Sequence, residues 1–143
     1  MKGISKYKIL NEQKLIVIFS QGNVDFEDIK LCREKVIRDK DFDPSYNLLL
    51  DLRRSKLNNT IDDMKGFGFF IYNNRELKEQ SLKIILTNTP EHVVYTTFLI
   101  NSLRNHKDNY EIFSSLPESL VHLRVNREDF NLVEGEIEQL IED

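Results

Sequence analysis

Histidine, cysteine and serine side chains could hold a metal ion or act as nucleophiles, and their spacing in this chain favours neither role. His92, His106 and His122 are the three histidines; no two lie four residues apart with a further ligand that would complete a zinc site. No G-x-S-x-G elbow is present to expose a nucleophilic serine. Loops of the P-loop or G-x-G-x-x-G type are also absent. We therefore predict no catalytic residue, no metal site and no cofactor, in a protein that is not an enzyme.

A charged segment that follows an apolar run is the clearest candidate for a functional surface. Residues 47–52 read NLLLDL, a run typical of a strand buried on both faces of a sheet. Open α/β sheets present their functional loops at the carboxyl ends of such strands. The sequence therefore predicts an interaction loop at this point, made of Asp51, Arg53, Arg54 and Ser55.

An unusual group of aromatic residues is the second candidate. Residues 61–73 have the apolar spacing of a helix, and residues 90–105 open with a Thr-Pro-Glu helix start. Four nearly consecutive aromatic positions point around the whole circumference of a helix, so one face cannot bury them all. A neighbouring helix, a dimer interface or an apolar ligand would cover the remainder. The candidate interface or ligand residues are Phe67, Phe69, Phe70, Tyr72 and Phe98.

The remaining pattern predicts the elements that would position these groups. Strands are expected at 7–10 and 15–19 as a hairpin, where Gln21–Gly22–Asn23 ends the second strand, and then at 47–52, 82–86 and 110–113. Further helices are expected at 26–39, with Asp25 and Asp28 as a capping box, at 116–123 and at 127–141. The alternation predicts an α/β fold: a single-layer mixed sheet of about five strands flanked by helices, with an extra C-terminal helix.

Length and composition bound the class of protein. A chain of 143 residues and 16.9 kDa fits one domain, with a core at about 5–125 and a helical extension at 126–143. Its net charge of −4 and pI of 5.5 disfavour a nucleic-acid partner. No apolar run approaches the roughly 18 residues of a membrane span. With Cys32 as the single cysteine and no signal peptide, we expect a cytoplasmic protein.

Three stretches resemble the STAS/SpoIIAA-like superfamily, and most of all its bacterial branch of uncharacterised members. They are NLLLDLRRS, LKIILTNTP and YEIFSSLPESLVHL. The resemblance implies a small α/β domain that regulates through protein contact without catalysis. Its anti-sigma-factor antagonists are switched by phosphorylation in an Asp-Ser-Ser-Gly-like turn after the strand equivalent to 47–52. Here Arg53 and Arg54 occupy that turn and the Ser-Gly pair is missing, so Ser55 is not expected to be a regulatory phosphosite.

The leading functional hypothesis is thus a non-catalytic regulatory or protein-interaction domain, which forms a homodimer and binds a further, unidentified protein. The competing hypothesis is a carrier or sensor of a small apolar or amphipathic, lipid-like ligand, held between helices 61–73 and 90–105. A pocket of several hundred cubic ångströms would favour the ligand, and a flat apolar patch would favour the protein contact.

Overall fold

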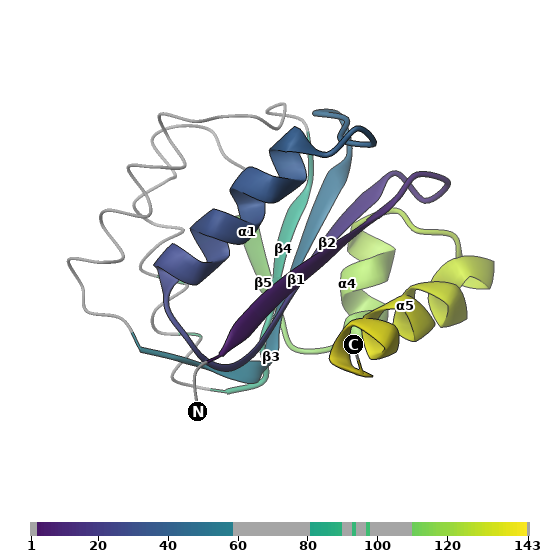
Figure 1. The fold of residues 1–143 in the computed structure, drawn as a ribbon. Coiled ribbons are helices and arrows are strands. Elements are labelled where there is room, and N and C mark those ends of the chain that lie inside the picture. The colour runs from purple at the N-terminus through teal and green to yellow at the C-terminus, as the bar shows by residue number, and fades with distance from the viewer. Residues whose placement is uncertain (1–2, 59–80, 90–92, 94–96, 98–109, 143) are drawn as a thin grey trace.

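The computed structural model describes residues 3–58, 81–89, 93, 97 and 110–142 (Figure 1). The elements in chain order are β1 (Ile4–Leu10), β2 (Leu15–Val24), α1 (Phe26–Arg38), β3 (Asn47–Leu57), β4 (Lys83–Leu86), β5 (Tyr110–Phe113), α4 (Leu116–His122), the 3-10 turn η2 (Arg127–Asp129) and α5 (Phe130–Glu142). The predicted helix 61–73 and the aromatic group Phe67, Phe69, Phe70, Tyr72 and Phe98 lie outside the described residues. Of the predicted helix 90–105, Val93 and Thr97 are described, and both are helical.

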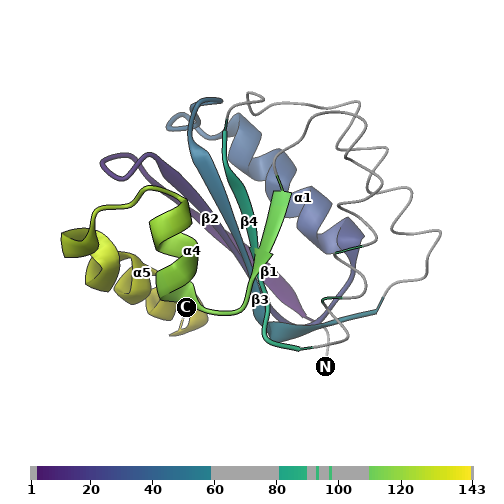
Figure 2. The same ribbon diagram turned by 180° about the vertical axis from the view of Figure 1, so that it is seen from behind.

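The strands form one five-stranded mixed sheet in the order β1-β2-β3-β4-β5. β1 runs antiparallel to β2, and the other neighbours pair in parallel. Helix α1 covers one face, and α4 and α5 cover the other (Figures 1 and 2). The predicted α/β class, the mixed sheet and the C-terminal helix are confirmed.

The central strands are buried on both faces, because successive side chains of a strand point to opposite sides. Leu48 and Leu50 of β3 pack under α1, whereas Leu49 between them packs under α4 and α5. All three are at most 6% exposed. The solid apolar runs in the sequence therefore arise from two hydrophobic layers that share one sheet.

Helix α1 begins at the predicted capping box. The Asp25 carboxylate accepts the Asp28 backbone N–H at 2.9 Å, and the Asp28 carboxylate accepts the Asp25 N–H at 3.1 Å. Two otherwise unpaired donors at the start of the helix are satisfied in this way. The apolar stripe that follows includes Cys32, whose burial raises its thiol pKa to about 11.

The predicted ends of β2 and β3 are wrong. Gln21–Gly22–Asn23 does not break β2, which continues to Val24 with Gly22 at a φ of 78°. β3 continues to Leu57, because its second half pairs with residues 21–24 of β2 after an irregularity in register between Phe19 and Gln21. Arg53, Arg54 and Ser55 therefore belong to a strand, and the predicted interaction loop is not a loop.

The C-terminal helix packs within its own chain. Val133 and Ile137 of α5 are at most 1% exposed and join the core cluster beneath α4 and α5. At the edge of the sheet, Lys6 Nζ donates to the carbonyl oxygen of Leu140 at 3.0 Å. The apolar stripe of α5 thus needs no second subunit, which removes one of the two reasons to expect a homodimer. The other reason, the aromatic group of residues 67–72, lies outside the described residues.

No helix within residues 3–58, 81–89 and 110–142 has the length and apolar character needed to cross a membrane.

Candidate functional site

Asp51 and Arg53 form a closed ion pair on β3. Arg53 Nε donates to Asp51 Oδ1 at 3.0 Å and Nη2 donates to Oδ2 at 2.9 Å, while the Arg53 backbone N–H also donates to Oδ1 at 3.1 Å. The Asp51 side chain is 1% exposed and that of Arg53 is 29% exposed. These hydrogen bonds raise the pKa of the Arg53 guanidinium above its usual value, against the opposing effect of burial.

The pair lies on the α4/α5 side of the sheet. Asp51 stands opposite Phe19 of β2 and Leu86 of β4, and both neighbours belong to the core cluster beneath α4 and α5. Arg53 lies on the same side, because its guanidinium binds both carboxylate oxygens of Asp51 and it lines the cavity with residues of α4 and α5. β4 ends at Leu86, so the pair sits at the carboxyl edge of the parallel strands, where the sequence predicted a functional surface.

A cavity of about 360 Å³ adjoins Arg53, and its lining residues come from the carboxyl edge of the sheet and from helices α4 and α5. One group of lining residues is apolar: Leu116, Pro117, Leu120, Phe130 and Ile137. The other group is polar or charged: Arg53, Asn88, Ser114, Ser115, Glu134 and Glu138. The lining is therefore mixed, with six polar or charged residues and five apolar ones. Small-molecule sites likewise combine apolar surface with polar groups that fix the orientation of a ligand.

Among the described residues at this cavity, negative charge predominates. Glu134 and Glu138 lie one turn apart on α5 and both are exposed. Their charges act on Arg53 and further raise its pKa. Arg53 itself is already paired with Asp51, so the two glutamates are the charges available to a molecule in the cavity.

The structure separates the four residues of the predicted interaction loop. Asp51 and Arg53 come together beside the cavity. The Ser55 hydroxyl instead donates to the Leu52 carbonyl oxygen at 2.9 Å, and Ser55 is half-buried. Arg54 is exposed. Only two of the four thus contribute to a common site.

Several cavity residues were not singled out in the sequence. Asn88 and Ser114 follow β4 and β5, so they lie at the same carboxyl edge as Arg53. The general rule that α/β sheets bind ligands at this edge would have pointed to them. Glu134 and Glu138 flank the apolar stripe of α5. No pattern in the sequence pointed to them, because their position at the cavity depends on how α5 packs on the sheet.

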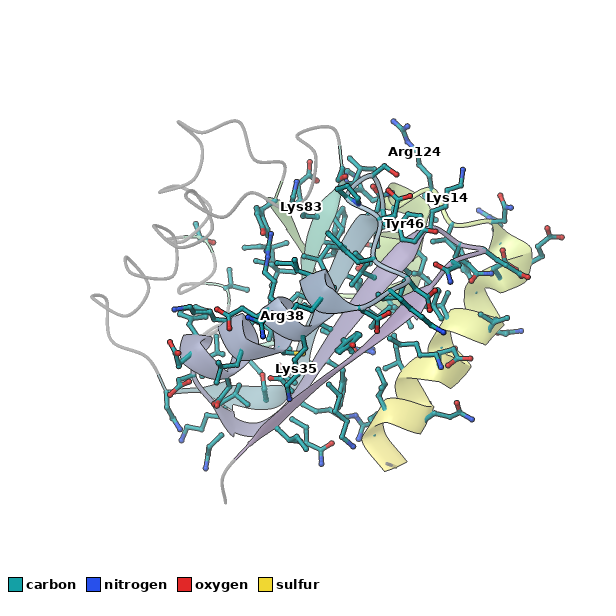
Figure 3. All side chains as sticks on the ribbon, turned by 45° about the horizontal axis from the view of Figure 1, so that its top comes forward. Lys14, Lys35, Arg38, Tyr46, Lys83 and Arg124 are labelled. Atoms are coloured by element: carbon teal, nitrogen blue, oxygen red, sulfur yellow. The ribbon has the colours of Figure 1, made fainter. Side chains whose placement is uncertain are left out.

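The opposite face of the sheet holds a buried polar pair. Arg33 is 6% exposed, and its Nη1 donates to Tyr110 Oη at 2.9 Å. Lys83, labelled in Figure 3, places Nζ 5.8 Å from the centre of the Tyr110 ring and donates to the Ser81 carbonyl oxygen. The two cavities beside Arg33 measure only about 10 and 20 Å³. They have room for a water molecule but not for an organic ligand.

The histidines do not define a site in the described part of the chain. His122 stacks on Phe113 with ring centres 5.2 Å apart and places Nε2 3.6 Å from a Glu111 carboxylate oxygen. His92 and His106 lie outside the described residues. Within the described ranges, no three side chains of His, Cys, Asp or Glu gather in a way that could hold a metal ion.

No protein-family model matches the chain, and no curated protein matches its sequence. The resemblance to SpoIIAA-like proteins therefore stays a prediction.

Proposed function

We propose that this protein is a non-catalytic binding domain that holds a small amphipathic ligand in the cavity beside Arg53. The observation that carries the proposal is the cavity itself. Its volume of about 360 Å³ lies in the range of about 300–1,000 Å³ that is common for small-molecule sites. Its apolar wall would take the body of the ligand, and the polar groups at the strand ends would orient the head.

The chemistry of the lining supports binding over catalysis. None of the described residues that line the cavity is a histidine or cysteine. Ser115 lines the cavity, and its hydroxyl caps α4 by accepting the Glu118 backbone N–H at 3.3 Å. Both carboxylate oxygens of Asp51 accept hydrogen bonds from Arg53. The described lining residues therefore do not supply the Ser–His or Cys–His pair that commonly activates a nucleophile.

The distribution of exposed apolar side chains also supports the cavity as the primary site. The large ones among the described residues each lie on a different segment: Ile4, Leu31, Val93, Val121 and Leu132. Single exposed apolar residues are normal on soluble proteins and do not by themselves mark a docking surface. Compared with these, the cavity beside Arg53 is the more specific feature.

Phenylpropanol is a suitable first probe, because it joins an apolar ring to an uncharged polar head. We expect it to bind with a Kd of about 1 mM or tighter, as an efficient fragment of its size would. NMR titration should show saturable shifts of the Asn88 and Ser114 amide signals. The absence of saturable shifts up to about 10 mM probe would overturn the proposal.

A matched pair of variants locates the binding. Asn88 is exposed and lines the cavity, so Asn88→Trp should occlude it and abolish the titration. Gln139 is exposed on α5 outside the lining, so Gln139→Trp should leave the affinity unchanged. If both variants bind the probe as the parent chain does, the site lies elsewhere.

A further inference from the structure

The charges around the cavity restrict the class of ligand. Within the part of the chain that the structure describes, Asp51, Glu134 and Glu138 supply three carboxylates at the cavity, and Arg53 supplies one guanidinium. The Asp51–Arg53 pair cancels, so the two glutamates leave an excess of negative charge. A positively charged ligand would reduce that excess, whereas an anion would increase it.

Arg53 is poorly placed to act as an anion receptor, although it lines the cavity. A guanidinium binds a carboxylate best through two parallel hydrogen bonds, and Arg53 already makes such a pair to Asp51 through Nε and Nη2. An incoming carboxylate would have to share Arg53 with Asp51 and approach two further negative charges. The remaining N–H groups of Arg53 are better suited to a neutral acceptor, such as a hydroxyl or carbonyl oxygen.

Helix α5 presents apolar and acidic side chains to the cavity in one stripe. Phe130, Glu134, Ile137 and Glu138 all line it, with the spacing i, i+4, i+7 and i+8 that places residues on one face of a helix. The two carboxylates are therefore next to an apolar wall. This arrangement is complementary to a molecule that carries a positive head on an apolar body.

We propose that the cavity selects an amphipathic amine, with its ammonium group between Glu134 and Glu138 and its apolar body against Phe130 and Pro117. The inference rests on the proposed function and adds the charge of the ligand to it. The proposed ligands are organic cations that are small enough to fit a cavity of about 360 Å³.

Three probes with one apolar body test the inference: phenylpropylamine, phenylpropanol and phenylpropanoate. Calorimetric titration of the full chain at low ionic strength should give at least a tenfold tighter Kd for the amine than for the carboxylate. This factor corresponds to about 1.4 kcal/mol. The alcohol should fall between them, and added salt should reduce the preference because it screens exposed carboxylates.

The variant Glu134→Gln/Glu138→Gln should abolish the preference for the amine, so that the Kd values of the amine and the alcohol become equal. Both side chains are exposed, and removal of two like charges one turn apart should not harm the helix. Glu128→Gln is the matched control, since Glu128 is exposed and outside the lining; it should retain the preference.

The outcomes separate the two proposals. If the alcohol binds and the carboxylate binds as tightly as the amine, the selection of a cation is overturned while the binding site stands. A preference for the amine that survives in the double variant also overturns it. If none of the three probes binds, the proposed function fails and the inference fails with it.

Discussion

The Arg53 guanidinium donates two hydrogen bonds to the carboxylate of Asp51, which lies two residues earlier on the same strand. Nε donates to Oδ1 at 3.0 Å and Nη2 donates to Oδ2 at 2.9 Å. The acid is almost fully buried and the base is partly exposed, so the pair joins the interior of the sheet to the wall of the cavity. A buried carboxylate without a counter-charge would be strongly unfavourable. Arg53 thus permits Asp51 to lie beneath α4 and α5, and it also lines the cavity.

Arg53→Ala should lower the free energy of unfolding by about 2–3 kcal/mol. A lost partner of a fully buried pair costs about 3–5 kcal/mol, and the exposure of Arg53 reduces that figure because water can solvate the remaining carboxylate. Urea denaturation at neutral pH measures the change. Arg54→Ala is the control: Arg54 is exposed on the same strand and should stay within about 0.5 kcal/mol of the parent chain. If the two substitutions change the free energy of unfolding equally, the Asp51–Arg53 ion pair does not stabilise the fold.

Leu50→Ala should cost roughly 2–5 kcal/mol, because it creates a cavity in the layer between β3 and α1. Leu31→Ala, at a residue of α1 that is 48% exposed, should cost less than about 0.5 kcal/mol beyond propensity effects. Chemical denaturation compares the two. A loss below about 0.5 kcal/mol for Leu50→Ala would contradict the central position of β3 in the sheet.

Ser55 should not act as a phosphorylation switch. Its hydroxyl is bonded to the Leu52 carbonyl within a paired strand, and Arg54 and Lys56 on either side would partly neutralise an added phosphate. Ser55→Ala and Ser55→Asp should therefore have equal effects on self-association, measured by sedimentation equilibrium. A tenfold difference in association constant between them, about 1.4 kcal/mol, would show that a switch exists at this position.

Stability at alkaline pH should depend on the hydrogen bond from Tyr7 Oη to Asp39 Oδ2, which is 2.7 Å long. That bond, with burial, raises the pKa of Tyr7 to about 12 from an ordinary value of 10.0. Because the folded-state pKa is the higher one, the contribution is complete below pH 10 and is lost as the pH rises toward 12. Tyr7→Phe should therefore reduce the fall in the free energy of unfolding between pH 10 and 12.

Cys32 also contributes to the pH dependence of the free energy of unfolding and must be separated from Tyr7. Burial raises the pKa of its thiol from 9.0 to about 11, so its stabilising contribution is lost from pH 9 to 11. The Tyr7→Phe variant should retain the Cys32 component. Cys32→Ser should retain most of the Tyr7 component, because the hydrogen bond to Asp39 is the largest cause of the raised Tyr7 pKa and the charge of Cys32 is a smaller one. Urea denaturation across this range distinguishes them. Unchanged pH dependence above 10 in Tyr7→Phe would rule out the hydrogen bond as its cause.

Local signals in the sequence determined most of the described elements. The capping box of Asp25 and Asp28 placed the start of α1, and the solid apolar runs placed the central strands, because caps and burial patterns depend on near neighbours. The chain order of a hairpin followed by alternating elements also led to the mixed sheet. The ends of β2 and β3 could not be obtained in this way. Polar residues such as Gln21 and Arg54 join a strand only because a partner strand supplies their backbone hydrogen bonds.

The site was determined by tertiary structure. The sequence marked Asp51 and Arg53 as residues at a strand end, but it predicted them in an exposed loop. Pairing of β3 with β2 extended the strand beyond Arg53, and the two side chains form their ion pair beside the cavity. The docking of α5 then brought Glu134 to the same cavity from about eighty residues away along the chain. Such contacts depend on how separate hydrophobic faces pack together, and no local spacing rule encodes them.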